Sequence, residues 1–130
     1  MKLTKNQKLW ISALQNGMYA QTKEHLRDEI GFCCLGVACD LYEKDTGVRL
    51  PRNGCNENNY AANTLFSVNH FSNVFDWLGL KSVVSQDILI KLNDGSYNNE
   101  KGEYFKSHTF QQIAEKVLSD PSTYFKVIED

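Results

Sequence analysis

The sequence has few arginines, no surplus of positive charge and no long apolar run. Its arginines are Arg27, Arg49 and Arg52, and 14 Lys and Arg stand against 16 Asp and Glu, so the net charge is -2. Binding to duplex nucleic acid needs cations gathered along one face, which makes that partner unexpected. No segment approaches the ~20 apolar residues that span a bilayer, and residues 1–10 do not resemble a secretion signal. We therefore expect no membrane partner and a cytoplasmic location.

The cysteines lack the spacing of a metal site. The sequence contains Cys33, Cys34, Cys39 and Cys55. A zinc site needs paired cysteines or histidines at short spacing on two loops, and here only Cys55 and His70 remain to complete a set. We expect no metal and no cofactor. In a reducing compartment the thiols are expected to be free and buried, packed as small hydrophobes.

The composition is that of a globular protein. Hydrophobic residues make up 42% of the 130 residues and charged residues 23%, which excludes a wholly disordered chain. The length suits one domain spanning residues 1–130, and no internal repeat or linker divides it. A chain of this size buries roughly two thirds of its unfolded surface, so it folds without a metal or a disulfide.

The pattern predicts an α+β domain that is mostly helical, with about five helices and a small antiparallel sheet. Apolar residues at helical spacing predict helices over residues 4–16, 34–44, 72–78, 85–92 and from 109 to the proline at 121. We expect Thr4 or Asn6 to cap the first helix and Ser85 to cap the fourth. Thr109 and Gln112 form a capping box before the last one.

Strand signals are short. Val48 to Leu50 is expected to be a strand that ends at Pro51, and residues 97–105 are typical of a hairpin. Residues 53–63 contain five asparagines, which predicts a loop, because asparagine side chains compete for the hydrogen bonds of regular structure. A loop of this length in a small domain is often functional, here by closing over a ligand.

The most apolar segment, residues 31–42, contains a glycine inside a predicted helix. A glycine in a helix interior costs ~1 kcal/mol relative to alanine. A helix that keeps Gly36 despite this cost is expected to have another part of the chain packed closely against its backbone.

Several blocks of the sequence resemble one group of proteins. These blocks are Trp10-x-x-Ala13-Leu14-x-x-Gly17-x-Tyr19-x-Gln21, Phe32-Cys33-Cys34-Leu35-Gly36-Val37-x-x-Asp40-Leu41, Trp77-Leu78-Gly79-Leu80, Leu92-Asn93-Asp94 and Thr109-Phe110-x-x-Ile113-Ala114. In them the chain resembles small uncharacterised proteins of tailed bacteriophages. The resemblance implies a viral protein that acts in the host bacterial cytoplasm. Small accessory phage proteins often disarm the host, for example by trapping nucleotide immune signals, and this analogy of origin suggests a role in countering host defence.

A shorter stretch, from Cys34-Leu35-Gly36-Val37 to Leu50-Pro51-Arg52, is similar to the nucleophile helix of the NlpC/P60 cysteine peptidases. In that family a Cys-x-Gly step opens a helix that ends before a glycine and Leu-Pro-Arg. The resemblance implies that Cys34 is a nucleophile, and the N–H groups of a helix N-terminus favour a thiolate. His70 is the candidate base, although its surroundings differ from the family's histidine strand, so the base stays open.

A polar and aromatic cluster precedes the cysteine block. It consists of Tyr19, Gln21, Thr22 and Arg27. A tyrosine ring can stack on a base, an amide can read the edge of that base, and a guanidinium can pair with a phosphate. Asn93 and Asp94 either shape the end of a helix or form hydrogen bonds with a ribose or base. These six residues are the candidate ligand site; the alternative for the first four is an exposed strand and loop.

Three functions fit these observations. The favoured one is a binding protein that sequesters a small anionic, nucleotide-like host molecule, because sequestration needs no acid–base pair. The second is a hydrolase or transferase that uses Cys34 and His70. The third is an inhibitor of a host enzyme, which needs a large exposed aromatic patch. The candidates for that patch are Phe66, Phe71, Phe75 and Tyr97. The oligomeric state stays open; one alternative is a homo-oligomer with the pocket lying across a two-fold interface.

Overall fold

The computed structural model describes residues 2–54, 56–65 and 70–126. Within these ranges the chain forms six helices and two separate antiparallel sheets of two strands each, which confirms the expected α+β class. In the same ranges no helix combines the length and the apolar character needed to cross a membrane. The elements are α1 (Lys5–Gln15), α2 (Cys34–Thr46), β1 (Arg52–Asn53), β2 (Asn56–Tyr60), α3 (Phe71–Leu78), α4 (Val83–Asp94), β3 (Ser96–Asn98), β4 (Glu103–Phe105), α5 (Phe110–Ser119) and α6 (Pro121–Tyr124).

Helices α1 and α5 both begin with a capping box. The amide N of Gln7 donates to Thr4 Oγ1 at 3.1 Å, and the Thr4 amide donates back to Gln7 Oε1 at 2.9 Å. Thr109 and Gln112 form the same reciprocal pair. The two bonds satisfy N–H groups that the first turn leaves unpaired, so the local sequence is enough to determine where each helix begins.

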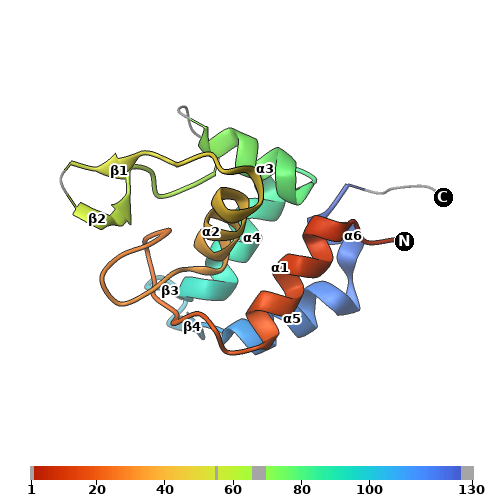
Figure 1. The fold of residues 1–130 in the computed structure, drawn as a ribbon. Helices are drawn as coiled ribbons and strands as arrows, with labels where there is room; N and C mark the ends of the chain where they lie inside the picture. Colours follow the sequence, from red (N-terminus) through yellow and green to blue (C-terminus); the bar gives the residue numbers. More distant parts are fainter. Residues whose placement is uncertain (1, 55, 66–69, 127–130) are drawn as a thin grey trace.

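Helix α2 lies at the centre of the structure and contacts α1, α3 and α4 (Figure 1). Buried side chains occur around most of its circumference, because neighbours cover it on several sides. Trp10 of α1 is fully buried, and its indole N–H donates to the carbonyl O of Cys34 at 2.8 Å. Phe125 meets the Trp10 ring edge to face, with 6.1 Å between the ring centroids. The C-terminal segment thus closes the core beside the start of α2.

Gly36 is the point where a loop rests directly on α2, as its place in the sequence predicts. A Cβ at this position would lie 1.6 Å from the carbonyl O of Leu26, a distance that no real side chain can adopt. The amide N of Cys33 donates to the same carbonyl at 3.1 Å, and Leu26 itself is fully buried. The loop between α1 and α2 is therefore seated on the first turn of α2 through its backbone.

The loop prediction for residues 53–63 is wrong over most of the segment. Asn53 lies in β1 and residues 56–60 form β2, which pairs with β1, while residues 61–63 are not in a strand. Arg52 lies opposite Tyr60 in the register. Tyr60 is buried in the core and its hydroxyl donates to Glu43 Oε1 at 3.1 Å, while Arg52 lies over its ring and bonds the same carboxylate. These contacts with α2 stabilise a hairpin that the local asparagine content disfavours.

Two further boundaries differ from the sequence prediction. Val48–Leu50 is not a strand, because the Leu50 amide donates to the Glu43 carboxylate at 2.8 Å rather than to a neighbouring strand. Helix α4 begins one turn early: Ser82 is its cap, and Ser85 is buried with its hydroxyl donating to the Thr123 carbonyl at 2.7 Å. The predicted hairpin over residues 97–105 is confirmed by β3 and β4.

Replacing Gly36 with alanine tests the seating of the loop. Helix propensity alone would favour Gly36→Ala by ~1 kcal/mol. Because the added Cβ collides with the Leu26 backbone, we expect a net loss of about 3 kcal/mol in the free energy of unfolding, measured by urea denaturation. Gly17→Ala is the control, since a Cβ there meets no atom within 4 Å at a φ of +74°. That control should lose only about 1 kcal/mol. Equal losses in both variants would contradict the close contact.

Candidate functional site

The six residues of the candidate ligand site lie in three places. Tyr19 and Arg27 line one surface depression. Gln21, Thr22 and Asn93 belong to a hydrogen-bond network between the loop and α4. Asp94 takes part in that network and also lines a separate small cavity. The structure therefore brings only two of the six together at an open surface.

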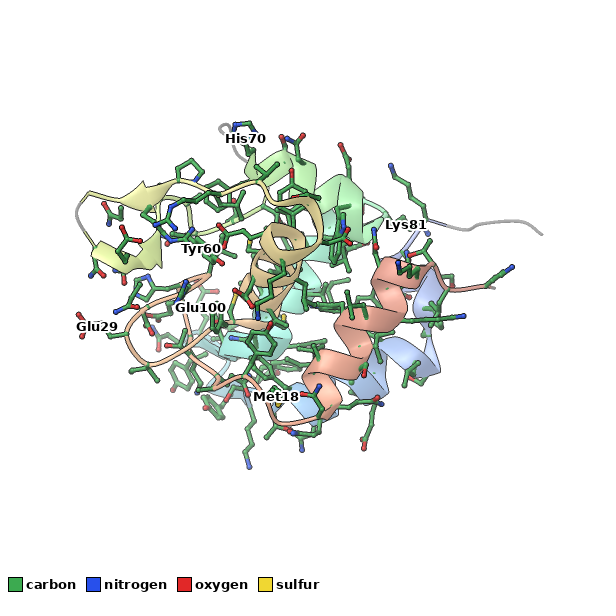
Figure 2. All side chains as sticks on the ribbon, in the orientation of Figure 1. Met18, Glu29, Tyr60, His70, Lys81 and Glu100 are labelled. Carbon is green, nitrogen blue, oxygen red and sulfur yellow. The ribbon has the colours of Figure 1, made fainter. Side chains whose placement is uncertain are left out.

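The depression lined by Tyr19 and Arg27, named here the Tyr19–Arg27 depression, lies between the loop preceding α2, the second half of α2 and β2. Its volume is about 380 Å³, which is within the range of small-molecule sites. Figure 2 shows Met18 and Glu29 at two separate points of this loop, with Glu29 directed away from the protein. The lining residues are Met18, Tyr19, Ala20, Arg27, Asp28, Glu29, Ile30, Gly31, Phe32, Asp40, Lys44 and Asn58.

Arg27 is held in this depression by aromatic rings. The guanidinium carbon lies 4.9 Å from the centroid of the Phe32 ring and 5.9 Å from that of Tyr60. Its side chain is partly buried, and in the described part of the chain it makes no ion pair and no hydrogen bond. Cation–π contacts leave the N–H donors of a guanidinium unused. Arg27 is therefore an oriented cation with its donors available to an anion.

Tyr19, on the opposite wall, already has polar partners. Its hydroxyl donates to Asp40 Oδ2 at 2.5 Å, and Lys44 Nζ lies 2.9 Å from the same carboxylate oxygen. The ring packs edge to face on Phe32 with 5.2 Å between centroids. Burial, followed by the hydrogen bond with Asp40, raises the pKa of Tyr19 to about 12. Its phenol is thus neutral at physiological pH, and the ring is fixed in orientation.

The carboxylates around Arg27 are engaged elsewhere. Burial of Asp28 opposes its ionisation, but hydrogen bonds from Thr22 Oγ1 and from two backbone amides outweigh it and lower the pKa of Asp28. Those amides belong to Ile30 and Gly31, at 2.9 and 3.2 Å. Asp40 is bound by Lys44 and Tyr19. Two of the three carboxylates in the depression are therefore already compensated by other groups.

Asn93 joins the loop to α2 and α4 from the interior. Its side chain is fully buried, and Oδ1 accepts from Gln21 Nε2 at 2.9 Å and from the Cys34 amide at 3.1 Å. Its Nδ2 donates to the Thr22 carbonyl and to Asp94 Oδ1, both at 2.9 Å. Both ends of the amide are fully used, so Asn93 is a cross-link in this structure.

Gln21 extends the network to the start of α5. Its Nε2 donates also to the carbonyl of His108 at 2.8 Å, and its Oε1 accepts from the Phe110 amide at 3.2 Å. Thr22 directs its hydroxyl to Asp28 at 2.8 Å. Thr22 therefore holds Asp28 at the Tyr19–Arg27 depression, while Gln21 attaches the loop to α4 and to the start of α5. Direct contact between a ligand and these two side chains stays a prediction.

A smaller cavity lies on the other side of the loop. Its volume is about 160 Å³, and Asp94 is the only candidate ligand residue that lines it. Asp94 Oδ1 also accepts from the Glu24 amide at 3.1 Å. The lining residues are Glu24, His25, Cys33, Asn63, Thr64, Ile90 and Asp94. This space is too small for a nucleotide, so it does not complete the ligand site.

Cys34 has the surroundings of a buried structural thiol. It is fully buried, and its Sγ donates to the Leu89 carbonyl O at 3.6 Å. Burial raises the pKa of Cys34 well above its usual value, and the nearby charges of Cys33 and Asp94 add to the shift. His70 caps α3 at the edge of the molecule, where its Nδ1 lies 3.4 Å from Asn73 Nδ2 (Figure 2). No hydrogen bond joins Cys34 and His70 among the residues that the structure describes.

The exposed aromatic residues lie mostly at other positions than those predicted from the sequence. Phe71 is buried and Phe75 is partly buried, while Phe66 lies outside the described residues. Tyr97 is exposed, and its cross-strand partner Tyr104 is exposed as well. The surface aromatics of the described chain thus gather on the β3–β4 hairpin rather than on α3.

Sequence reasoning missed Phe32, Asp40 and Lys44 at the depression, and it placed Tyr60 in a loop that closes over a ligand rather than beneath Arg27. Asp40 and Lys44 are four apart on α2, and this spacing was a usable signal for an ion pair. Phe32 and Tyr60 hold Arg27 from different parts of the fold. Nothing local to either aromatic residue predicts that contact.

Removing the Asn93 side chain should loosen the loop. Asn93→Ala leaves the buried Cys34 N–H and Thr22 C=O without their partner, so we expect a loss of about 3 kcal/mol in the free energy of unfolding. Asn99→Ala, at an exposed position in the β3–β4 turn, is the matched control and should change stability by less than about 0.5 kcal/mol. Urea denaturation measures both variants, and a loss in Asn93→Ala no larger than that of the control would contradict the network.

Tyr19 makes stability depend on alkaline pH. Its pKa is 10.0 when unperturbed and about 12 in the folded chain, so the folded state favours the protonated phenol. The resulting stabilisation is complete below pH 10 and is lost as pH rises toward 12. We expect the free energy of unfolding to fall less steeply over this window in Tyr19→Phe than in the parent chain, as measured by urea denaturation at several pH values. If the free energy of unfolding falls equally steeply with pH in both proteins, the Tyr19 hydroxyl contributes nothing to this pH dependence.

The chain was compared with known proteins and protein families. Neither the curated proteins nor the solved structures contain a significant match. A protein-family model, described as Domain of unknown function (DUF8296), matches residues 1–120. That range contains the Tyr19–Arg27 depression, the Asn93 network and all but the last few residues of the described fold. The chain belongs to the DUF8296 family.

Proposed function

We propose that the chain binds a small anionic, nucleotide-like molecule in the Tyr19–Arg27 depression and holds it without transforming it. The observation that carries the proposal is the state of Arg27, a partly buried guanidinium held against two aromatic rings without a carboxylate partner in the described chain. A phosphate oxygen pair matches the fork of a guanidinium and forms charge-assisted hydrogen bonds with it.

The aromatic contacts prepare Arg27 for this role. A free arginine side chain loses rotamer entropy when it binds a ligand, and a side chain already ordered by Phe32 and Tyr60 loses less. Partial burial also weakens the competition from water. The same contacts that keep Arg27 in place therefore increase its affinity for an anion.

The rest of the depression suits the uncharged part of a nucleotide. Met18 and Ile30 are 78% and 72% exposed and lie at its lining, where they offer apolar surface to a flat base. Asn58 lines it as well and supplies an amide for polar edges.

Binding without turnover agrees with the surroundings of the thiols. Cys34 is fully buried with a raised pKa, which is the opposite of what a cysteine nucleophile needs. A protein that only sequesters its ligand needs no general base. In line with the resemblance to tailed-phage proteins, we propose that the ligand is a nucleotide signal of a bacterial host and that the protein acts in the host cytoplasm.

The test replaces the cation and measures binding. Nucleotides bound to the purified protein are identified by mass spectrometry after heating, and their affinity is measured by calorimetry. We expect Arg27→Ala to weaken the binding of AMP-like ligands by about tenfold to a hundredfold, since a charge-assisted hydrogen bond contributes about 1.5–3 kcal/mol. Arg27→Lys keeps the charge without the fork, and it should weaken binding less.

Lys91→Ala is the matched control, because Lys91 Nζ lies 4.9 Å from the centroid of Phe105, the same separation as between Arg27 and Phe32. It removes a cation from an aromatic ring away from the depression and should leave affinity unchanged. Failure to recover or bind any nucleotide, or equal affinity in Arg27→Ala and the parent chain, would refute the proposed function.

A further inference from the structure

The Tyr19–Arg27 depression has a second cavity beside it. This second space, named here the Arg49 cavity, has a volume of about 240 Å³ and is lined by Glu43, Lys44, Gly47, Val48, Arg49 and Arg52. Lys44 lines both spaces, so they adjoin each other at this side chain. Tyr60 also links the two, because Arg27 approaches its ring at 5.9 Å and Arg52 at 4.5 Å.

The lining of the Arg49 cavity is positive, although the whole chain is not. Lys44, Arg49 and Arg52 face a single carboxylate, that of Glu43, in a chain with a net charge of -2. That carboxylate is already saturated: besides Arg52, it accepts from the Tyr60 hydroxyl and the Leu50 amide. Glu43 therefore presents no uncompensated negative charge to a ligand.

Two of the three cations have exposed side chains, although Lys44 also pairs with Asp40 at 2.9 Å and lies over the Tyr19 ring. The side chains of Lys44 and Arg49 are 69% and 62% exposed. Arg49 pairs with Glu57, which is 76% exposed, and such exposed ion pairs are weak because water screens them. A phosphate, which accepts more hydrogen bonds from a guanidinium, can replace this carboxylate partner. Arg52, by contrast, is fixed by Glu43 and shapes the wall.

We propose that the Arg49 cavity is a second phosphate subsite, so that the preferred ligand carries two separated phosphates, as a dinucleotide does. One phosphate binds Arg27 in the depression, and the other passes Lys44 to reach Arg49. This inference rests on the proposed function, since it names the class of ligand for the same site. It accounts for the placement of all three arginines of the chain beside one hairpin.

The experiment compares AMP with the 5′-phosphorylated dinucleotide pApA by calorimetry. We expect pApA to bind about twofold to fivefold more tightly than AMP, the gain of one exposed charged contact. Arg49→Ala should remove this gain and leave the affinity for AMP unchanged. Glu57→Gln removes the competing carboxylate and should increase the affinity for pApA alone. Lys101→Ala, at an exposed cation of the β3–β4 turn, is the control and should alter neither ligand.

The outcomes separate this inference from the proposed function. If AMP binds and Arg27→Ala weakens it, but pApA gains nothing or Arg49→Ala leaves pApA unchanged, the second subsite is refuted while the proposed function stands. If Arg49→Ala weakens AMP and pApA equally, Arg49 does not contact a second phosphate and the inference is also refuted. If neither ligand binds, both proposals fail.

Discussion

The contact between the Leu26 carbonyl and Gly36 is the constraint on which the candidate site depends. A side chain larger than hydrogen at Gly36 would occupy the place of that carbonyl, so only glycine allows the loop to rest on α2. Arg27 follows Leu26 directly in the chain, and its approach to Phe32 and Tyr60 starts from this anchored backbone. The fold thus accepts a glycine in its central helix, at a cost of ~1 kcal/mol in helix propensity, and gains a fixed position for its free guanidinium.

Asn93 provides a second attachment of the loop that also rests on Gly36. The glycine joins the loop to α2, and the Asn93 amide joins the same loop to the end of α4, while Gln21 continues the connection to the start of α5. A segment with almost no regular secondary structure is therefore attached to three helices through buried hydrogen bonds. Buried polar networks of this kind, with both ends of each amide satisfied, hold a single conformation. The Tyr19–Arg27 depression is consequently formed before any ligand arrives, which lowers the entropy cost of binding.

The parts of the fold that the sequence predicts well are those whose signals are local. The capping box at Thr109, the choice of Thr4 or Asn6 as the first cap and the close packing on Gly36 follow from residues within one turn of the feature. The asparagine-rich hairpin could not be predicted in this way, because Tyr60 and Arg52 are held by Glu43 of α2. The candidate site likewise contains residues with local signals and residues whose position depends on distant parts of the chain. Tyr19 and Arg27 were recognisable from residue type, whereas the inward orientation of Gln21 depends on Asn93, 72 residues away in the chain.

The distribution of arginine places the proposed anion binding at one site rather than over the chain as a whole. Lysines are spread along the sequence, but each of the three arginines contacts the β1–β2 hairpin: Arg27 and Arg52 through the Tyr60 ring, and Arg49 through Glu57. A guanidinium stacks on an aromatic face and still offers a planar set of donors, which an ammonium group cannot do. Structural pairing explains Arg52, whose carboxylate partner is buried beside it, but it does not explain Arg27, which has aromatic neighbours and no carboxylate in the described chain. A cation kept in place without a counter-charge can gain further stabilisation from an anion, and this is the physical basis of the proposed anion binding.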